Sequence, residues 1–322
     1  MIPMNPDFNA GRYRFLQTLG TGSFSTVFRA LDRETGDIVA IKVTHAFQNG
    51  LWVPETAPTI SREIRAMAAL TQGDNQHENV VRMIDCALVP RNADTTDVWM
   101  VLENMNFDLE VYTDLIVRFL GQMDIEEIRR ISYMMLKGVR HIHSNGYVHR
   151  DVKPNNALID LYSGTVKVGD LGFAVPESEA TERGNFGAPY YRSPEVYLDS
   201  APCGRSSDMW AVGVSICRMV LGRQLFNATN EMGVLDMMLT MLGVPDADIV
   251  IERFRPLLPG YQNYANINFV NNTPVELHRI GQDGLALIAG LLAIDWNVRM
   301  TADDALASPF FDSIRDPPQE AP

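Results

Sequence analysis

The sequence is short of the features that mark secreted, membrane-spanning and disulfide-rich proteins. Its 322 residues include only three cysteines, which are too few and too widely scattered for a disulfide framework or a zinc site. We therefore expect reduced thiols and an intracellular protein, located in the nucleus, the cytoplasm or both. Residues 1–11 lack the apolar segment of a signal peptide. The longest apolar run, residues 285–294, is too short to span a bilayer.

Positive charge is also scarce. The chain has 27 Lys and Arg against 40 Asp and Glu, a net charge of −13. Because binding to a nucleic-acid backbone or an anionic membrane depends on clustered positive charge, we expect neither as a partner. The rest of the composition, 46% hydrophobic and 21% charged, is ordinary for a globular protein, and the length allows one large or two small domains.

Two short polar segments, YVHRDVKPNN and VGDLG, stand out between apolar runs. They place Asp151, Lys153, Asn156 and Asp170 at the spacing that phosphoryl transfer from ATP requires. Asp151 would accept the proton of the substrate hydroxyl, and Lys153 would offset the charge of the transferred group. Asn156 and Asp170 would hold Mg²⁺. The spacing H-R-D-x-x-x-x-N followed by D-x-G resembles the protein-kinase signature.

A second candidate phosphate-binding element lies near the amino terminus. Gly20 and Gly22 in the segment GTGSFSTVF would let a hairpin backbone fold closely over phosphates. A Rossmann loop also carries G-x-G, but that motif joins a strand to a helix. Strand signals on both sides favour the kinase hairpin here, although Ser25 replaces its third glycine. Lys42 ends the strand VAIK, the form of the kinase lysine, whereas a lone lysine would be an exposed edge residue.

Glu63 is the expected partner of Lys42. It lies in residues 59–70, where apolar residues at helical spacing share one face, namely Ile60, Ile64, Met67 and Leu70. One interpretation is a solvated helix carboxylate. The other is the ion-pair partner that orients Lys42 toward the ATP phosphates.

The pattern of apolar residues changes from strands to helices at residues 103–109. Strands are predicted before this point, in residues 13–43, 80–88 and 98–102, with loops at 44–58 and 91–97. Helices are predicted after it, in residues 126–144, 207–221, 231–242 and 284–294. A connector at this point can offer backbone groups to an adenine edge, and we expect Glu103 and Met105 to do so.

Together these segments resemble a eukaryotic-type protein kinase over residues 13–312. The motifs occur in the family's order, as GTGSFSTV, VAIK, the helix with Glu63, HRDVKPNN, DLG, YYRSPE, SSDMW and Arg299. The resemblance implies an α+β, bilobal kinase fold with a small β-rich lobe (13–104), a larger helical lobe (105–312) and a short tail (313–322). It also implies a buried ion pair between Glu195 and Arg299.

The resemblance further implies a serine/threonine kinase that transfers the γ-phosphoryl group of ATP to protein hydroxyls, with Mg²⁺ as the metal cofactor. The implied nucleotide-binding residues are Leu19, Gly20, Thr21, Gly22, Ser23, Phe24, Ser25, Thr26, Val27, Ala40, Lys42, Glu63, Glu103, Met105, Leu158 and Asp170. A pseudokinase that binds ATP and partners without efficient catalysis is the alternative. Only Ser25 and Ala188 favour a pseudokinase. Lys42 and the side chains of Asp151, Asn156 and Asp170, which an active kinase needs, are all present.

The segments YYRSPE, 225–246 and 296–311 resemble the group of cyclin-dependent and mitogen-activated kinases, and cyclin-dependent kinases are nearest. The helix that contacts cyclin in those kinases keeps Arg62 and Glu63 but little else, so a cyclin partner stays uncertain. Phe24 stands at the site of an inhibitory phosphotyrosine. These departures resemble fungal single-subunit kinases that activate cyclin-dependent kinases, which would make other kinases the protein substrates.

The activation segment departs from the group as well. Leu171 replaces the phenylalanine of D-F-G, and Ala188 replaces a threonine that normally hydrogen-bonds the catalytic aspartate and lysine. We expect this loss to loosen Asp151 and Lys153 by at most about 1.5–3 kcal/mol. Two of the three arginines that read an activating phosphothreonine are present, but the third position is Val175. We therefore predict little need for phosphorylation of Thr181, with a loop glutamate pairing Arg62 or Arg150 instead.

Overall fold

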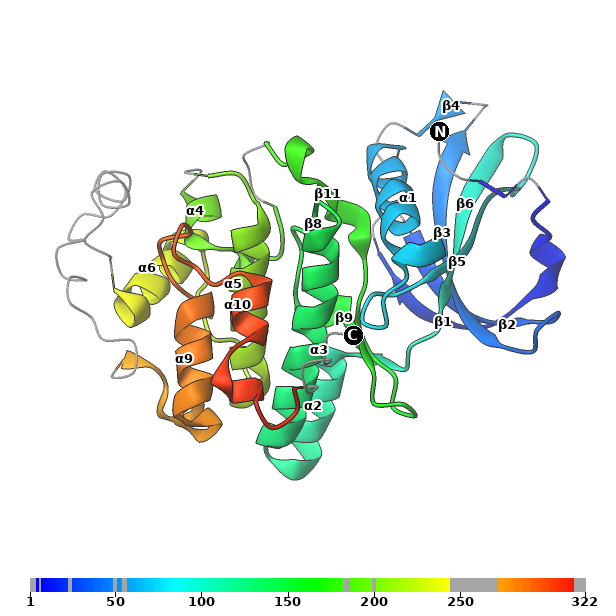
Figure 1. Cartoon of the computed structure of the whole chain (residues 1–322). Coiled ribbons are helices and arrows are strands. Elements are labelled where there is room, and N and C mark those ends of the chain that lie inside the picture. The colour runs from blue at the N-terminus through cyan, green and yellow to red at the C-terminus, as the bar shows by residue number, and fades with distance from the viewer. Residues whose placement is uncertain are drawn as a thin grey trace, which may run out of the picture.

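The computed structural model describes residues 4–5, 7–22, 25–48, 51–53, 57–181, 186–198, 201–243 and 272–315. The chain forms a β-rich lobe and a helical lobe that meet side by side (Figure 1). The bilobal α+β fold expected from the sequence is thus confirmed. Ser23, Phe24 and residues 244–271 and 316–322 lie outside the described residues. No helix in the described part of the chain is long and apolar enough to cross a membrane.

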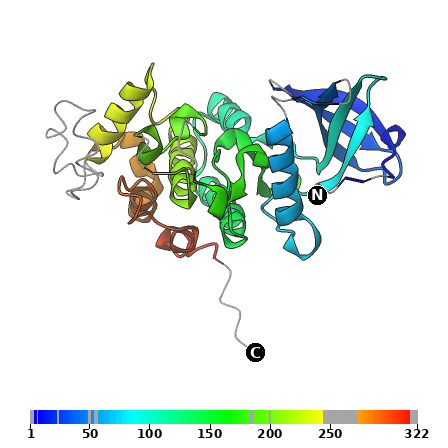
Figure 2. The ribbon, with the colours of Figure 1, turned by 90° about the horizontal axis from the view of Figure 1, so that it is seen from above.

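The small lobe is an antiparallel sheet in the order β1-β2-β3-β6-β5. Its strands are β1 (Tyr13–Thr21), β2 (Ser25–Asp32), β3 (Ile38–Gln48), β5 (Met83–Pro90) and β6 (Thr95–Glu103), with β4 (Leu51–Trp52) paired to the end of β3. Helix α1 (Ala57–Thr71) stands beside the sheet, between it and the helical lobe, as Figure 2 shows in light blue. The predicted helix that carries Glu63 is confirmed.

Two loops expected from the sequence are shorter than predicted. Strand β3 runs on to Gln48 because its last residues keep pairing with β6, His45 with Asp97 and Gln48 with Thr95. The expectation of loops throughout 44–58 and 91–97 was therefore wrong at their strand-facing ends. Polar residues can occupy these positions because the strand pairing satisfies the backbone. Two of them, Thr44 and Asp97, are buried, and Asp97 is paired with His45 and Arg91.

The large lobe is built around two long helices. These are α3 (Ile125–Ser144) and α5 (Arg205–Leu221), and α5 is buried along almost its whole length. Around them lie α2 (Leu109–Leu120), α4 (Pro194–Tyr197), α6 (Glu231–Leu242), α9 (Gly281–Leu291) and α10 (Ala302–Leu306). Helix α3 packs closely against the segment that precedes β5, since a Cβ atom on Gly138 would lie 2.3 Å from the Asn79 carbonyl oxygen. Only glycine fits this approach.

Short strands hold the loops at the junction of the lobes. Strand β8 (Tyr147–Val148) pairs with β11 (Val175–Pro176), while β9 (Ala157–Ile159) pairs with both β7 (Phe107–Asp108) and β10 (Val166–Val168). Short 3-10 helices follow in η3 (Pro154–Asn156), η4 (Leu171–Phe173) and η6 (Pro189–Tyr191). The HRDVKPNN segment is thus fixed between β8 and β9, and the DLG segment directly after β10.

The expected ion pair of Glu195 and Arg299 ties the far end of the large lobe together. The Arg299 guanidinium donates to both carboxylate oxygens of Glu195, at 2.7 and 2.9 Å, and both side chains are fully buried. Arg299 also donates to the backbone oxygens of Ala293 and Ser206. Because each polar atom has a partner, the burial of these charges is compensated.

Candidate active site

Asp151 is held by three hydrogen-bond donors. One carboxylate oxygen, Oδ2, accepts from Lys153 Nζ at 2.6 Å and from Asn156 Nδ2 at 2.8 Å. The other, Oδ1, accepts from the backbone N–H of Ala188 at 3.1 Å. Asp151 is itself only 6% exposed. A carboxylate fixed in this way has one orientation toward the space between the lobes, as a positioned base requires.

Asp208 fixes the backbone that precedes Asp151. Its two carboxylate oxygens accept from the backbone N–H groups of His149 and Arg150, each at 2.8 Å, and Oδ2 also contacts His143 Nε2 at 2.8 Å. Burial opposes the charge on Asp208, but these contacts outweigh it and lower its pKa. Asp208, in the first turn of α5, therefore anchors the backbone of the catalytic loop. Arg150 can therefore hold a left-handed φ of 66°.

Lys42 and Glu63 form the expected ion pair. Lys42 Nζ lies 2.6 Å from Glu63 Oε1 and 3.2 Å from Asp170 Oδ1, and Glu63 is 5% exposed. Burial opposes the charge on Lys42, but the two carboxylates outweigh it and raise its pKa. Burial likewise opposes the charge on Asp170, and the attraction of Lys42 outweighs it and lowers the pKa of Asp170. The lysine thus stays charged at the point where the strand, the helix and the DLG segment meet.

Asn156 and Asp170 are brought together as the sequence predicted. The Gly169 N–H donates to the Asn156 carbonyl at 2.7 Å, which joins the two loops. Asn156 Nδ2 donates to the carbonyl and the carboxylate of Asp151, which leaves the amide oxygen as the group that can ligate a cation. One amide oxygen and one carboxylate suit Mg²⁺, which takes its other ligands from water and substrate phosphates. No cluster of three or more acidic, histidine or cysteine ligands occurs among the described residues.

The cleft between the lobes has a volume of about 820 Å³. Its walls include Asn156, predicted to hold Mg²⁺, and these residues predicted to bind nucleotide: Leu19, Gly20, Thr21, Gly22, Ser25, Val27, Ala40, Lys42, Glu63, Glu103, Met105, Leu158 and Asp170. Thr26 is an exception, because neighbouring residues of a strand point to opposite faces and Thr26 borders a cavity on the other side of the sheet. Leu102, which the sequence analysis missed, faces the cleft opposite Ala40. The pairing of the two strands is the signal that could have found it.

Glu103 joins the lobes through its side chain. Its carboxylate accepts from the Arg82 N–H at 2.7 Å and from Lys167 Nζ at 2.9 Å. Arg82 precedes β5 in the small lobe, whereas Lys167 lies on β10 in the large lobe. The connector therefore enters the cleft at a fixed position, with Met105 two residues further along its wall.

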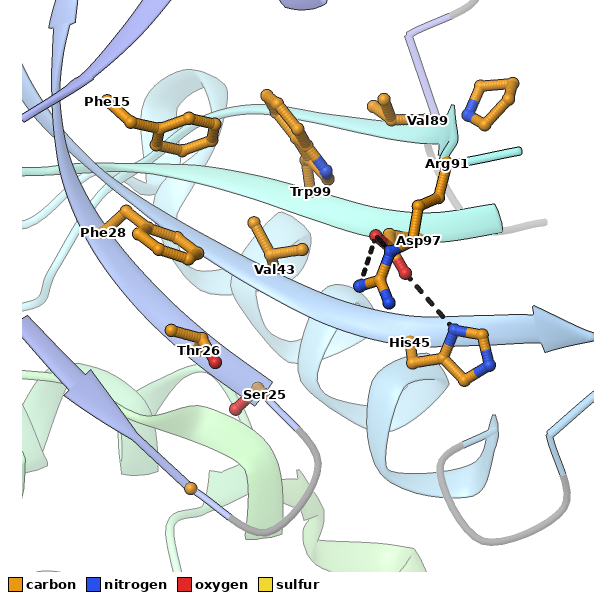
Figure 3. Close-up of a pocket in the computed structure, with 12 residues that line it drawn as sticks. Phe15, Ser25, Thr26, Phe28, Val43, His45, Val89, Arg91, Asp97 and Trp99 are labelled. Carbon is orange, nitrogen blue, oxygen red and sulfur yellow. Dashed lines mark hydrogen bonds and ion pairs between the residues drawn. The ribbon is translucent and has the colours of Figure 1, made fainter. Parts of the chain in front are cut away.

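A second cavity, of about 560 Å³, lies on the outer face of the sheet. Phe15, Phe28 and Trp99 line it, and Asp97 at one end is bonded to His45 and Arg91 (Figure 3). Lys42, Asn156 and Asp170 line the cleft and do not border this cavity. The cleft between the lobes is therefore the candidate active site.

Comparison with known proteins agrees with this geometry. The protein kinase domain model matches residues 13–311. The chain belongs to the protein kinase family. It is 30% identical to mitogen-activated protein kinase 12 of Danio rerio over 319 residues, which cover 96% of this chain and 81% of the relative. It is 28% identical to cyclin-dependent kinase B2-1 of Oryza sativa subsp. japonica over 306 residues, 94% and 90% of the two chains. It is also 31% identical to cell division control protein 2 homolog 1 of Trypanosoma brucei brucei over 320 residues, which cover 93% of this chain and 98% of the relative.

These relatives make the protein a serine/threonine kinase of the group that holds mitogen-activated and cyclin-dependent kinases. In a kinase of this family Asp151 would orient the acceptor hydroxyl and take its proton, and Lys153, whose Nζ lies 2.6 Å from Asp151 Oδ2, would offset the charge on the transferred phosphoryl group. Lys42, held by Glu63, would contact the phosphates of ATP. Mg²⁺ bound by Asn156 and Asp170 would neutralise charge on those phosphates.

Two expectations for the activation segment of this kinase stay predictions. The first is that loss of the threonine hydroxyl at position 188 loosens Asp151 and Lys153. The backbone N–H of Ala188 donates to Asp151 Oδ1 at 3.1 Å, but a threonine would supply the same N–H. Glu177 pairs with Arg205, at 2.5 Å. The predicted pairing of a loop glutamate with Arg62 or Arg150 stays a prediction, because residues 182–185 lie outside the described residues.

Proposed function

We propose that this kinase is catalytically active with ATP and Mg²⁺ and prefers a serine or threonine that is followed by proline. The observation that supports this preference is the backbone at Gly187. Its φ of 78° turns the carbonyl oxygen toward Arg192, whose Nη2 atom donates to it at 3.2 Å. Arg192 is itself fixed by Glu231, at 2.7 Å.

Gly187 lies where we expect the substrate peptide to pass, so its carbonyl can affect substrate choice. Its neighbour Ala188 contacts Asp151, so the substrate residue after the acceptor hydroxyl, about 3.8 Å further along the peptide, passes Gly187. With the carbonyl engaged by Arg192, an ordinary residue would leave its own N–H without an acceptor, at a cost of about 1–3 kcal/mol. Proline has no N–H and avoids that cost.

A positional peptide library tests the preference. Peptides with proline after the acceptor should give kcat/KM about tenfold or more above matched peptides with alanine, since 1.4 kcal/mol corresponds to a factor of ten. Equal values for the two series would overturn the proposal. Asp151→Asn is the control for enzyme activity, because a signal that survives this change comes from a contaminating kinase.

A second candidate follows from the departures at Val175, Ala188 and the helix that carries Arg62. They support a kinase that works without a cyclin and phosphorylates other kinases, as fungal single-subunit activators of cyclin-dependent kinases do. Running the library and a panel of inactive kinases with and without a cyclin separates the candidates. The scarcity of cysteine supports action inside the cell, in the nucleus, the cytoplasm or both, which we also propose.

A further inference from the structure

The aromatic ring of Phe186 lies on the guanidinium of Arg150. The Arg150 Cζ atom is 4.4 Å from the ring centroid, well within the range of a cation–π interaction. Arg150 is only 3% exposed, and its Nε donates to the Phe173 carbonyl at 2.8 Å. One arginine next to the catalytic base therefore contacts both the beginning and the end of the activation segment.

The backbone around Phe186 is fixed from a second side. Arg192 donates through Nε to the Phe186 carbonyl and through Nη2 to the Gly187 carbonyl, each at 3.2 Å. The cavity enclosed between this stretch and the catalytic loop measures about 20 Å³, room for about one water molecule. Little free space therefore lies between the Phe186 stretch and the catalytic loop.

Those residues rest on the catalytic loop. A Cβ atom on Gly187 would lie 3.0 Å from the Arg150 carbonyl oxygen, so the two backbones are in close contact there. The next N–H, that of Ala188, donates to Asp151 Oδ1 at 3.1 Å. Phe186, Gly187 and Ala188 thus lie along Arg150 and Asp151. The Phe186 ring contacts the Arg150 guanidinium, the Gly187 backbone contacts the Arg150 backbone, and the Ala188 N–H donates to the Asp151 carboxylate.

We propose that Phe186 is a positioning residue for phosphoryl transfer. Its ring, held on the Arg150 guanidinium, keeps the Ala188 amide against the carboxylate of Asp151. The amide supplies a donor to the catalytic base, and the aromatic contact keeps that donor in place without any phosphate on the activation segment. Phe186 acts through Arg150 and Ala188 and does not touch the reacting atoms.

The test compares variants that keep or remove the aromatic face. Phe186→Leu should lower kcat about tenfold or more, equivalent to about 1.4 kcal/mol, with KM for ATP within about twofold of the wild type. Phe186→Tyr should retain most of kcat, since its ring keeps the negative face that attracts the cation. The matched control is Phe310→Leu, which removes a similar ring from Arg129, 4.7 Å away, far from the catalytic loop. It should lower the melting temperature and leave kcat unchanged.

Pentafluorophenylalanine at position 186 covers the case in which Phe186→Leu does not fold. This ring keeps the shape of phenylalanine, but its face repels a cation, so kcat should fall without loss of secondary structure by circular dichroism. The proposal is overturned if the fluorinated ring leaves kcat unchanged, or if Phe186→Tyr loses as much activity as Phe186→Leu. Treating the wild type with phosphatase should not alter kcat, and a large loss would also contradict the proposal. A failed proline preference would leave all these comparisons intact.

Discussion

At position 188 a methyl group stands where related kinases place a hydroxyl, and the catalytic carboxylate is still well supplied with donors. Lys153, Asn156 and the Ala188 N–H all donate to Asp151. What the hydroxyl would add is a contact that reaches Lys153 as well. Within the part of the chain that the structure describes, Lys153 is held by Asp151, whose Oδ2 lies 2.6 Å from Lys153 Nζ.

Ala188→Thr should change activity little. The added hydroxyl can hydrogen-bond Asp151 or Lys153, but Asp151 already has three donors, so we expect kcat to rise by less than about fivefold, under about 1 kcal/mol. Steady-state kinetics on one protein substrate measures this. A gain of a hundredfold or more would show that the present donors fail to position the base.

Thr181→Ala should leave purified enzyme within about threefold of wild-type kcat. The reason is that Val175 stands at one of the three arginine positions, which weakens any phosphate site, while Arg150 already contacts Phe173 and Phe186. Thr181 is exposed, so the substitution removes no core packing. A loss of activity by orders of magnitude, with an unchanged melting temperature, would show that phosphorylation at this residue is required.

At the scale of the elements, a titratable contact links the loop after α1 to α3. His77, in the loop after α1, stacks on His141 of α3 with ring centroids 4.8 Å apart, and its Nδ1 accepts the Asn79 N–H at 3.0 Å. Burial, together with the nearby charge of His141 and Lys137, lowers the pKa of His77 to about 4. The imidazole is therefore neutral in the folded protein and accepts this hydrogen bond.

Stability should fall as the pH drops below about 6.5, where the unfolded chain gains a proton on His77 that the folded chain binds only near pH 4. The loss from this residue is at most about 1.4 kcal/mol per pH unit. His77→Asn keeps a short acceptor but does not titrate. Melting temperatures of the two proteins should therefore converge or cross between pH 7.5 and 5. Parallel curves would exclude this residue as a source of the pH dependence.

The sequence pattern predicted which helices and strands form better than it predicted where each begins and ends. The helix around Glu63 and the long helices α3, α5 and α6 follow from apolar periodicity, and each occurs within about two residues of its predicted bounds. The extension of β3 to Gln48 could not be predicted, since polar residues there give no strand signal and only pairing with β6 specifies it. Local pattern carries no information about such a partner.

The site shows the same limit. Asp151, Lys153, Asn156 and Asp170 could be found because their chemistry fixes residue type and spacing. The ring of Phe186 on Arg150 could not, because 36 residues separate them and a phenylalanine in a polar loop has no motif. A backbone donor such as the Ala188 N–H leaves no trace in the sequence at all.

At the scale of the whole molecule, one buried ion pair joins the α4 region to the segment between α9 and α10. Arg299→Ala would leave the Glu195 carboxylate buried without its partner cation, and we expect a cost of about 3–5 kcal/mol in the free energy of unfolding. Chemical denaturation measures it. Arg315→Ala, which breaks the exposed pair with Asp312, is the control and should cost less than about 1 kcal/mol. Similar values for the two variants would contradict the role given to burial.

The two lobes are also joined through Glu103, which accepts from Arg82 on one side and Lys167 on the other. Backbone hydrogen bonds of Val81 with Val168 and of Val168 with Asn79 join the same two regions. The connector is therefore held to both lobes by side-chain and backbone contacts.

The contact of Phe186 with Arg150 has a consequence for how a cell could control this enzyme. A phosphate is added by one enzyme and removed by another, so an activation segment that depends on phosphate can be turned on and off within minutes. A phenylalanine ring enters the chain once, during translation, and no phosphatase can remove it. Control of such a kinase passes to its synthesis, its destruction and the supply of its substrates.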